Sequence, residues 1–362
     1  LPILDKAYES DEISSTEENE LNSVYMVNSY KYIELKNKKT NIRFVDAIKN
    51  TLYEKMTNDS NVILMGQDIA EYGGVFKITE GFVEKFGKSR VRNTPIIESA
   101  AIGAGMGLAI EGYKPVIEMQ FADFVSVGFN QIVNNLAKTY YRWNQPVNVT
   151  LRLPTGGGIG AGPFHSQSNE SWFFHVPGLK LVYPSCPSDA KGLLLSSIDD
   201  NNPVLFFEHK ALYRSQKEMV SEENYHIGIG KAKVLQKGNS ITIVTYGLGV
   251  IWMKEFIDNN KEFKEKLELI DLRTLLPWDK DTVLSSIKKT NRVLILSEDN
   301  LTGSISAEIS AYITENVFEY LDAPVVRLGS LDTPVPFSDN IEKEVFFPIS
   351  KIEEKIKFLM NY

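Results

Sequence analysis

The sequence predicts an α/β protein with two domains, residues 41–225 and 226–362, which follow a polar arm of residues 1–40. Three observations predict this class. Short apolar segments alternate with segments of helical periodicity, which is typical of a mostly parallel sheet covered by helices. The alternation stops at a polar, glycine-containing stretch, SEENYHIGIGKAKV (221–234), and then restarts. The chain has 362 residues, 43% of them hydrophobic, which is enough for two cores of ordinary size.

The first domain begins near Asn41, where apolar residues take up helical spacing in IRFVDAIKNTLYEKMTND. Beyond it, segment length and period separate short apolar strands from helices of about ten or more residues. The predicted elements, in chain order, are helix 42–59, strand 61–68, helix 98–112, strand 114–119, helix 121–141, strand 147–154, strand 179–184, helix 188–200 and strand 203–210.

The second domain repeats the same alternation. Its predicted elements are strand 240–247, helix 250–266, strand 267–277, helix 279–290, strand 292–299, helix 304–320 and strand 323–330. The arm is charge-rich and has no sustained period, so we expect a linker or extended segment. Three of its tyrosines, Tyr25, Tyr30 and Tyr32, are expected to dock on the domains.

Charge and composition exclude several classes of function. The net charge is −8 with both signs mixed along the chain, which argues against nucleic acid and anionic membranes as partners. No apolar run approaches the ~20 residues of a membrane span. A single cysteine, Cys186, cannot form an internal disulfide and indicates a reducing compartment, so we predict a cytoplasmic protein. Cys186 lies between two prolines without a neighbouring histidine, which disfavours a catalytic role.

Three glycine-containing motifs resemble phosphate-binding loops but depart from their patterns. GFVEKFGKS (81–89) has five residues between its glycines where a P-loop has four, so Gly87 is better explained as a helix C-cap. GAGMG (103–107) lies inside the predicted helix 98–112, where small residues indicate close packing against another helix. TGGGIGAG (155–162) follows a strand without opening a helix, which favours a mobile active-site loop over a dinucleotide cradle.

The histidines offer one candidate for catalysis. No pair has the spacing of a zinc site, and no G-x-S-x-G motif supports a serine hydrolase. His165 follows the glycine-rich loop, at a strand end where α/β sheets place their chemistry. A loop histidine bonded to neighbouring serines is an equally good explanation. His175, among the bulky apolar residues of WFFHVPG, is better explained as a structural histidine.

Glu98 is the second candidate. It follows two isoleucines and precedes an Ala- and Gly-rich helix, so an ionisable carboxyl group is carried into an apolar setting. Such a group costs free energy unless a partner meets it. Backbone donors at the helix start could be that partner, and so could a bound ligand. The residues alone leave both alternatives open.

Many linked motifs together resemble the beta subunit of thiamine diphosphate-dependent 2-oxo acid dehydrogenases. This subunit belongs to the decarboxylating component of the pyruvate and branched-chain complexes and is related to transketolase. The resemblance runs from about Arg43 to Phe347. It rests on VILMGQDIAEYGGVFKIT, VRNTPIIESAAIGAGMGLA, EMQFADF, QIVNNLAKTYYR, FHSQSNESWFFHVPGLKLVYPSCPSDAKGLLLSSI, PVLFFEHKALYR, IDLRTLLPWD and LDTPVPF. It implies a pyrimidine-binding domain with a mostly parallel sheet, followed by a transketolase C-terminal-like α/β domain.

The resemblance also implies roles for the candidate residues. Glu98 matches the glutamate that shares a proton with a ring nitrogen of the cofactor's aminopyrimidine, which promotes loss of the thiazolium proton. Ile96, Gln120 and Phe124 match the other pyrimidine contacts. His165 matches the active-site histidine, which binds or protonates the intermediate or assists acyl transfer to lipoamide.

Branched-chain relatives bind a structural potassium ion in this subunit. The matching positions here are Val149, Thr150, Ser197, Asp200 and Asn202. A serine stands where a relative has a cysteine, and only Asp200 and Asn202 are informative by residue type.

Two departures affect the prediction. Gly66-Gln67-Asp68 replaces a common G-E-D, and a glutamine cannot relay a proton between two active sites. The G-D-G…N pattern that holds magnesium and the diphosphate is missing from the sequence. In the family that pattern belongs to the alpha subunit, so an α₂β₂ assembly is implied, with helix 99–110 as a candidate subunit contact. The arm could equally be the linker of a fused alpha-beta chain or the extension of a separate beta subunit.

We therefore predict the beta part of an enzyme that decarboxylates a 2-oxo acid and passes the acyl group to the lipoyl domain of an acyltransferase core. The motifs FHSQS and FFEHKALYR favour branched-chain 2-oxo acids, with pyruvate as the alternative. A transketolase-like enzyme and a non-catalytic scaffold that retains the fold are the remaining alternatives. Gln67 favours the scaffold, whereas the presence of both Glu98 and His165 argues against it.

Overall fold

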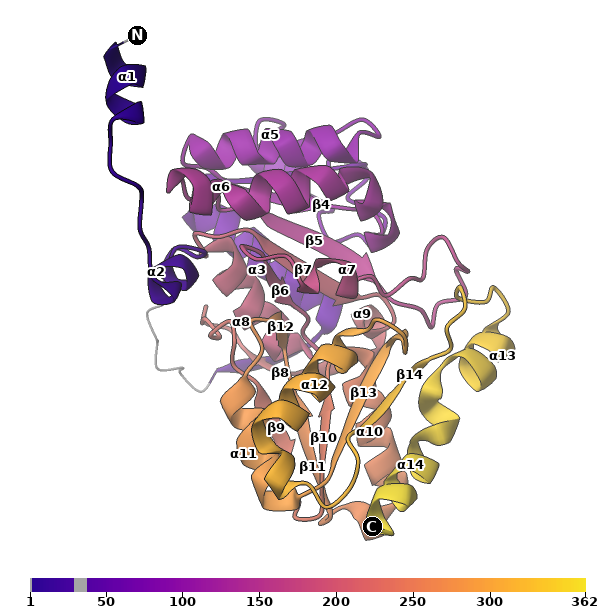
Figure 1. The fold of residues 1–362 in the computed structure, drawn as a ribbon. Helices are drawn as coiled ribbons and strands as arrows, with labels where there is room; N and C mark the ends of the chain where they lie inside the picture. The colour runs from indigo at the N-terminus through magenta and orange to yellow at the C-terminus, as the bar shows by residue number, and fades with distance from the viewer. Residues whose placement is uncertain (1, 29–37) are drawn as a thin grey trace.

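The structure, a computed structural model, describes residues 2–28 and 38–362. Within these ranges the chain forms two large sheets, each with helices on both faces, which lie one below the other in Figure 1. The predicted α/β class with two mostly parallel sheets is confirmed.

The first sheet has the strand order β12-β6-β7-β5-β4-β2-β3, and every pair except β12–β6 is parallel in the described part of the chain. Strands such as β2 and β5 are buried on both faces, which explains why they appear in the sequence as continuous apolar runs. The strands are β2 (Val62–Gly66), β3 (Val91–Asn93), β4 (Lys114–Glu118), β5 (Thr150–Thr155), β6 (Lys180–Val182), β7 (Val204–His209) and β12 (Thr274–Leu276).

Helices cover both faces of this sheet (Figure 1). In α3 the residues Phe44, Ile48, Leu52 and Met56 follow one another at intervals of four and are all buried, so they form the stripe that packs on the sheet. One face carries α3 (Phe44–Asn58) and α8 (Pro187–Ile198), and the other carries α5 (Glu98–Ile110), η1 (Ala122–Gly128), η2 (Gln131–Leu136) and α6 (Ala137–Trp143). Short helices follow three strands: α4 (Phe82–Phe86), α7 (Ser171–Phe174) and α9 (Leu212–Ser215).

The second sheet has the order β14-β13-β10-β11-β9, with β9 antiparallel at one edge. Its strands are β9 (Lys233–Gln236), β10 (Ile241–Thr245), β11 (Leu267–Asp271), β13 (Val293–Asn300) and β14 (Val326–Ser330). Its helices are α10 (Leu248–Asn259), η3 (Lys261–Phe263), α11 (Lys280–Thr290), α12 (Ile305–Val317), η4 (Phe318–Tyr320), α13 (Asp339–Ile341), η5 (Glu342–Phe346), η6 (Pro348–Lys351) and α14 (Ile352–Met360). A continuous hydrophobic cluster joins the two sheets, so the domains share a core.

The predicted strand 267–277 is wrong as a single element. It divides at Arg273, whose φ of 60° turns the chain, and its halves enter different sheets as β11 and β12. A small two-stranded sheet of antiparallel β1 (Lys39–Arg43) and β8 (Lys217–Ser221) was not predicted.

The predicted helix 121–141 is irregular. A 3₁₀ segment, η1, and a π segment, η2, precede the regular α6. Gly128, the last residue of η1, allows this run to lie close to α5. A Cβ at this position would be 2.4 Å from Cδ1 of Ile102. Helix 250–266 is also shorter than predicted, since α10 ends at Asn259.

Glycine predictions have mixed outcomes. Gly87 is the C-cap of α4, as predicted, with φ of 79°. In α5 the predicted packing against another helix holds at Gly103, where a Cβ would lie 3.5 Å from Nε2 of Gln131 in η2, but a Cβ on Gly105 would lie 2.4 Å from Cδ1 of Ile117 in strand β4. His175 is exposed, so its interpretation as a structural histidine enclosed by apolar residues is wrong.

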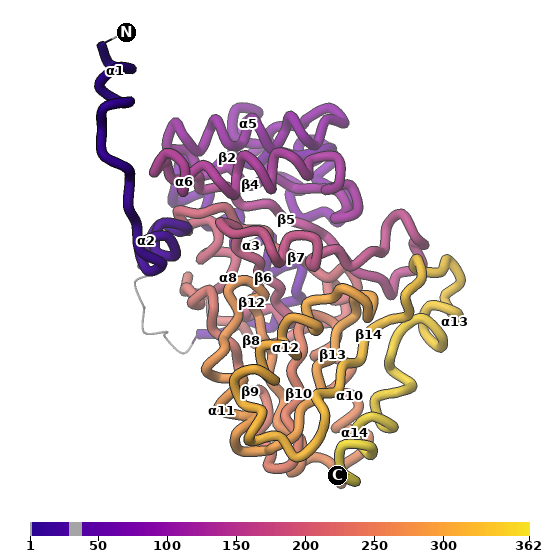
Figure 2. The backbone as a smooth tube through the Cα atoms, viewed as in Figure 1, coloured from indigo at the N-terminus to yellow at the C-terminus, as the bar shows by residue number. Residues whose placement is uncertain are grey.

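The arm carries two short exposed helices, α1 (Pro2–Tyr8) and α2 (Glu17–Asn22), where an extended segment was expected. Figure 2 shows α2 beside the first domain and α1 projecting away from it. The Tyr25 hydroxyl donates to the Leu179 carbonyl at 3.0 Å, so this tyrosine docks as predicted. Tyr30 and Tyr32 lie outside the described residues. In residues 2–28 and 38–362, no helix has both the length and the apolar character to cross a membrane.

Candidate active site

The candidate site lies at the carboxyl edge of the first sheet. The chain passes from β2 to β3 on one side of β2 and then crosses to β4 on the other side. The loops after β2 and β4 therefore diverge at a topological switch point, where α/β sheets bind their ligands. The side chain of Gln120, after β4, donates to Oδ2 of Asp68, after β2, at 3.0 Å. This hydrogen bond joins the two loops.

Glu98 is the first residue of α5 and is 7% exposed. Its Oε1 accepts a hydrogen bond from Nε2 of Gln67 at 2.9 Å. Among the described residues the partner of this carboxyl group is thus a side chain and not the backbone donors of the helix start. The position at a helix N-terminus adds a favourable field for a negative charge.

An aromatic cluster lies beside the switch point. The rings of Phe121 and Phe124 are 5.9 Å apart and pack edge to face. The His165 ring packs edge-on against both, with centroid distances of 4.8 Å to Phe121 and 5.6 Å to Phe124. The structure therefore brings into contact His165 and Phe124, which the resemblance names separately, and adds Phe121.

Ile96 lies in the exposed segment directly before Glu98. Its side chain is 81% exposed, and the neighbouring Ile97 is 45% exposed. A nearly buried carboxyl group, an aromatic face and an apolar rim suit a planar heteroaromatic ring that carries a basic nitrogen. The residues present therefore fit the pyrimidine end of thiamine diphosphate.

A buried ionic triad underlies the site. Arg152 in β5 donates to Glu208 in β7 through Nε at 2.7 Å and Nη2 at 2.8 Å, and it also pairs with Glu118 in β4. Burial raises the pKa of Glu118, although Arg152 opposes this shift. The triad joins three neighbouring parallel strands. Sequence reasoning missed it, and its signal was a charged residue in each of three otherwise apolar strands.

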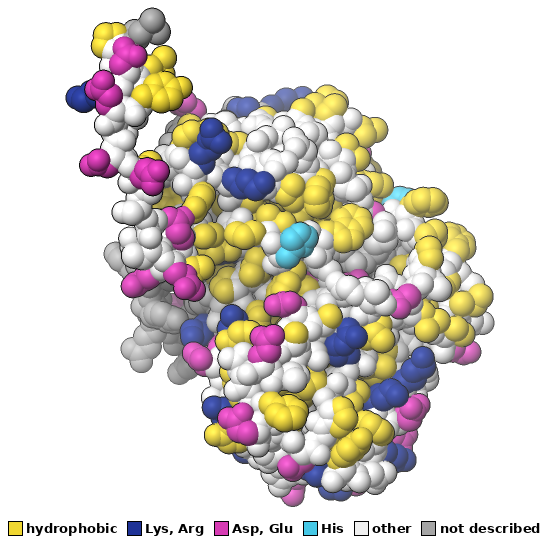
Figure 3. All heavy atoms as spheres, viewed as in Figure 1, with side chains coloured by type: hydrophobic (Ala, Val, Ile, Leu, Met, Phe, Trp, Pro, Cys, Tyr) yellow, Lys and Arg dark blue, Asp and Glu magenta, His cyan; other side chains and the backbone are white. Residues whose placement is uncertain are grey.

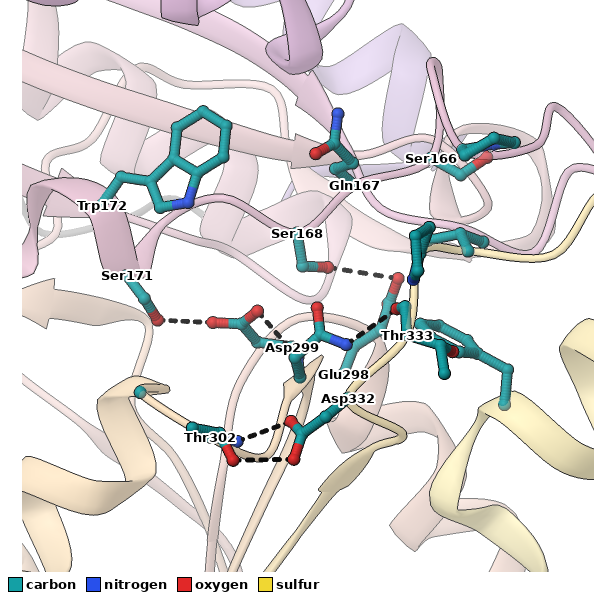
Figure 4. A pocket seen from close by; sticks show the side chains of 16 residues that line it. Ser166, Gln167, Ser168, Ser171, Trp172, Glu298, Asp299, Thr302, Asp332 and Thr333 are labelled. Carbon is teal, nitrogen blue, oxygen red and sulfur yellow. Dashed lines mark hydrogen bonds between the residues drawn. The ribbon is translucent and has the colours of Figure 1, made fainter.

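The loop that carries His165 contacts the second domain. In Figure 2 it lies beside the C-terminal segment at α13. Between the domains is a cavity of about 530 Å³, whose lining includes Ser166, Trp172, Glu298 and Asp299 (Figure 4). Burial raises the pKa of Asp299 to about 6. The sequence did not predict this interdomain cavity.

The predicted potassium ligands also lie close together, but their oxygen atoms already accept hydrogen bonds or form an ion pair within the protein. Asp200 Oδ2 pairs with Lys180 Nζ at 2.7 Å, and Asp200 Oδ1 accepts from the backbone and side chain of Asn202. Asn202 Oδ1 accepts from the Met26 backbone at 2.8 Å. The Ser197 carbonyl accepts from the Thr150 hydroxyl at 3.1 Å, and the Val149 carbonyl accepts from Val204 at 2.9 Å. The Lys180 ammonium already supplies a positive charge here, so the potassium site stays a prediction that this geometry does not favour.

Comparison with known proteins gives two matching family models. They are the transketolase pyrimidine-binding domain over residues 40–216 and the transketolase C-terminal domain over residues 230–352. A solved structure titled split gene transketolase, inactive beta4 tetramer, has a TM-score of 0.71 at 20% identity, and the match covers 88% of this chain and 98% of that chain. This likeness supports the fold alone.

Curated relatives are more similar in sequence. 2-Oxoisovalerate dehydrogenase subunit beta of Bacillus subtilis is 42% identical over 88% of this chain and 98% of the relative. The mitochondrial 2-oxoisovalerate dehydrogenase subunit beta 2 of Arabidopsis thaliana is 44% identical over 87% of this chain and 88% of the relative. Pyruvate dehydrogenase E1 component subunit beta of Staphylococcus aureus is 40% identical over 87% of this chain and 98% of the relative. Because these matches span both domains, the chain belongs to the family of beta subunits of thiamine diphosphate-dependent 2-oxo acid dehydrogenases.

Proposed function

We propose that this chain is the beta part of a dehydrogenase that decarboxylates branched-chain 2-oxo acids and transfers the acyl group to lipoyl groups of an acyltransferase. The placement of Glu98 and of the Phe124–His165 ring contact at the carboxyl edge of the same sheet carries the proposal. Identities of 42% and 44% with beta subunits of 2-oxoisovalerate dehydrogenases support the branched-chain substrate. Pyruvate is the second candidate, because a pyruvate dehydrogenase beta subunit is 40% identical.

Each residue has a separate task in this proposal. Glu98 shares a proton with a ring nitrogen of the aminopyrimidine, while the Gln67 amide holds Oε1 and leaves Oε2 toward the ligand. Ile96, Gln120 and Phe124 enclose the pyrimidine. Thiamine diphosphate supplies the carbon nucleophile and the electron sink for decarboxylation.

His165 acts on the substrate side. Its ring is fixed edge-on by Phe121 and Phe124, and it is only partly buried. We propose that it binds or protonates the reacting group, or assists acyl transfer to the lipoyl group.

An alpha part completes the site in this proposal. Large apolar side chains are exposed around Glu98 and along α5, and burial against a partner would remove them from water. They are Ile96, Ile97, Ile110, Val127 and Phe129, between 36% and 81% exposed. On the face seen in Figure 3, hydrophobic side chains also gather along the band between the two domains. We assign magnesium and the diphosphate to the alpha part, and the assembly to α₂β₂.

The second domain is our candidate contact for the acyltransferase core.

Cytoplasm remains the predicted compartment, supported by the single cysteine. The Arabidopsis relative carries the word mitochondrial in its name.

The role of Glu98 is tested by Glu98→Gln in the complex reconstituted with its alpha part, thiamine diphosphate and magnesium. We expect decarboxylation to fall by about 10²-fold or more, because an amide cannot exchange a proton with the ring. Glu84→Gln, the same change at an exposed position in α4, is the matched control and should keep full activity. Unchanged decarboxylation by Glu98→Gln would contradict the assigned role and favour a scaffold that retains the fold.

A further inference from the structure

The loop that carries His165 needs an external support. This glycine loop, residues 156–165, contains Gly156, Gly158, Gly160 and Gly162, which all have φ between 66° and 82°. Glycines move readily between conformations, and ordering them costs more backbone entropy than ordering other residues. The loop sequence alone therefore does not fix the position of His165.

Two carboxylates of the second domain meet the loop backbone. The Gly157 N–H donates to Oε1 of Glu298 at 2.7 Å, and the Gly158 N–H donates to Oε1 of Glu342 at 2.8 Å. Glu298 comes from β13 and Glu342 from the first position of η5. Hydrogen bonds to ionised acceptors are about twice as strong as neutral ones.

The surroundings orient the Glu298 carboxylate, whereas Oε2 of Glu342 is buried without a hydrogen-bond partner among the described residues. Glu298 is 5% exposed and Glu342 is fully buried. The Ala211 N–H donates to Nδ1 of His209 at 3.2 Å, so the ring proton lies on Nε2 and is donated to Oε2 of Glu298. Burial alone would raise the pKa of Glu298, but His209, Gly157 and Lys210 outweigh it and hold that pKa below its usual value.

Close packing reinforces these hydrogen bonds. A Cβ on Gly157 would lie 2.5 Å from Oε1 of Glu342 and 3.0 Å from Cζ of Phe347. A Cβ on Gly162 would lie 2.7 Å from Cδ2 of Phe337. The loop backbone is thus pressed against residues 337–347 of the second domain.

The chain on the far side of His165 is held by the first domain. The backbone N–H and the side-chain amide of Gln167 both donate to Oδ1 of Asp123, at 3.1 Å and 3.0 Å. His165 therefore lies between two anchored points, one on each domain.

We propose that Glu342, together with Glu298, is a positioning residue that holds the glycine loop from the second domain and so fixes His165 in the active site. This inference rests on the proposed function, in which His165 contacts the reacting group. The second domain then contributes to turnover by holding this loop.

Kinetics of the reconstituted complex provide the first test. Glu342→Ala removes the acceptor, and we expect kcat to fall by about 10- to 100-fold with little change in KM, because a displaced catalytic group costs rate more than binding. Glu342→Gln keeps an acceptor oxygen of the same shape and should recover part of that loss. Glu344→Ala, an exposed change in the same turn, is the control and should match the wild type.

Hydrogen exchange of the full chain provides a readout that does not depend on activity. In Glu342→Ala, amides of residues 156–165 should exchange about tenfold faster or more, while those of β5 and β7 stay unchanged. Unchanged loop exchange, or wild-type kcat in Glu342→Ala, would overturn the proposal. If the wild-type complex turned over no 2-oxo acid, the proposed function would fail, whereas the exchange result would still decide whether Glu342 holds the loop.

Discussion

Gln67 shows how one residue alters the chemistry around a carboxylate. The sequence identified Glu98 as an ionisable group in an apolar setting, and the structure supplies its partner, the amide of Gln67. Gln67 comes from a different strand end, 31 positions earlier, so no local pattern could have paired the two residues. Gln67, the residue that favoured a non-catalytic scaffold because it replaces a common glutamate, thus contacts Glu98 in the candidate site. This contact weakens the scaffold alternative.

Lys210 is a second residue that the sequence did not single out. It is 4% exposed, and its Nζ has no hydrogen-bond partner among the described residues. Burial lowers the pKa of Lys210 to about 8, although Asp123, Glu298 and Glu342 act in the opposite direction. The cost of burying the ammonium group thus exceeds its attraction to three carboxylates.

This shift predicts a pH dependence of stability. Between pH 8 and 10.5 the unfolded chain keeps the Lys210 proton while the folded chain has lost it, so the contribution of Lys210 to stability rises with pH. Urea unfolding of wild type and Lys210→Met should show the wild type gaining about 1–2 kcal/mol relative to the variant between about pH 7 and pH 9.5. A difference that is constant over this range would show that Lys210 is not the buried cation described.

At the level of elements, sequence reasoning succeeded where burial sets the pattern. Strands β2, β5 and β7 are buried throughout, and α3 has one apolar stripe, so periodicity identified them. It failed where tertiary contacts override the local pattern. The run 267–277, LELIDLRTLLP, has apolar residues along its whole length, yet its two halves pair with different sheets, and only the partners reveal the division.

The ionic triad across β4, β5 and β7 makes a prediction about these strands. Arg152→Met should lower the free energy of unfolding by about 3–5 kcal/mol, because Glu118 and Glu208 would face each other without a buried cation. The same substitution at the exposed Arg142 should change it by less than about 0.5 kcal/mol. Equal stability of the two variants in urea unfolding would mean that the triad does not support these strands.

At the scale of the whole molecule, the two domains act as one unit around the candidate site. Three features join them. They share a hydrophobic cluster, β12 from the second domain pairs with β6 in the first sheet, and Glu298 and Glu342 contact the glycine loop. The arm adds another long-range contact, since Met26 and Asn202 bond through backbone and side chain. None of these contacts is visible in a single stretch of sequence, whereas the resemblance over both domains predicted the fold and the family.

The most direct test of the account is turnover by the reconstituted complex of this chain with its alpha part, thiamine diphosphate and magnesium. Reduction of an artificial electron acceptor would be followed in parallel with 2-oxoisovalerate, 4-methyl-2-oxopentanoate, pyruvate and 2-oxoglutarate. We predict turnover with the highest kcat/KM for the branched-chain acids, and none when either part is omitted. A folded, cofactor-loaded complex that turns over none of the four acids would contradict the proposed function.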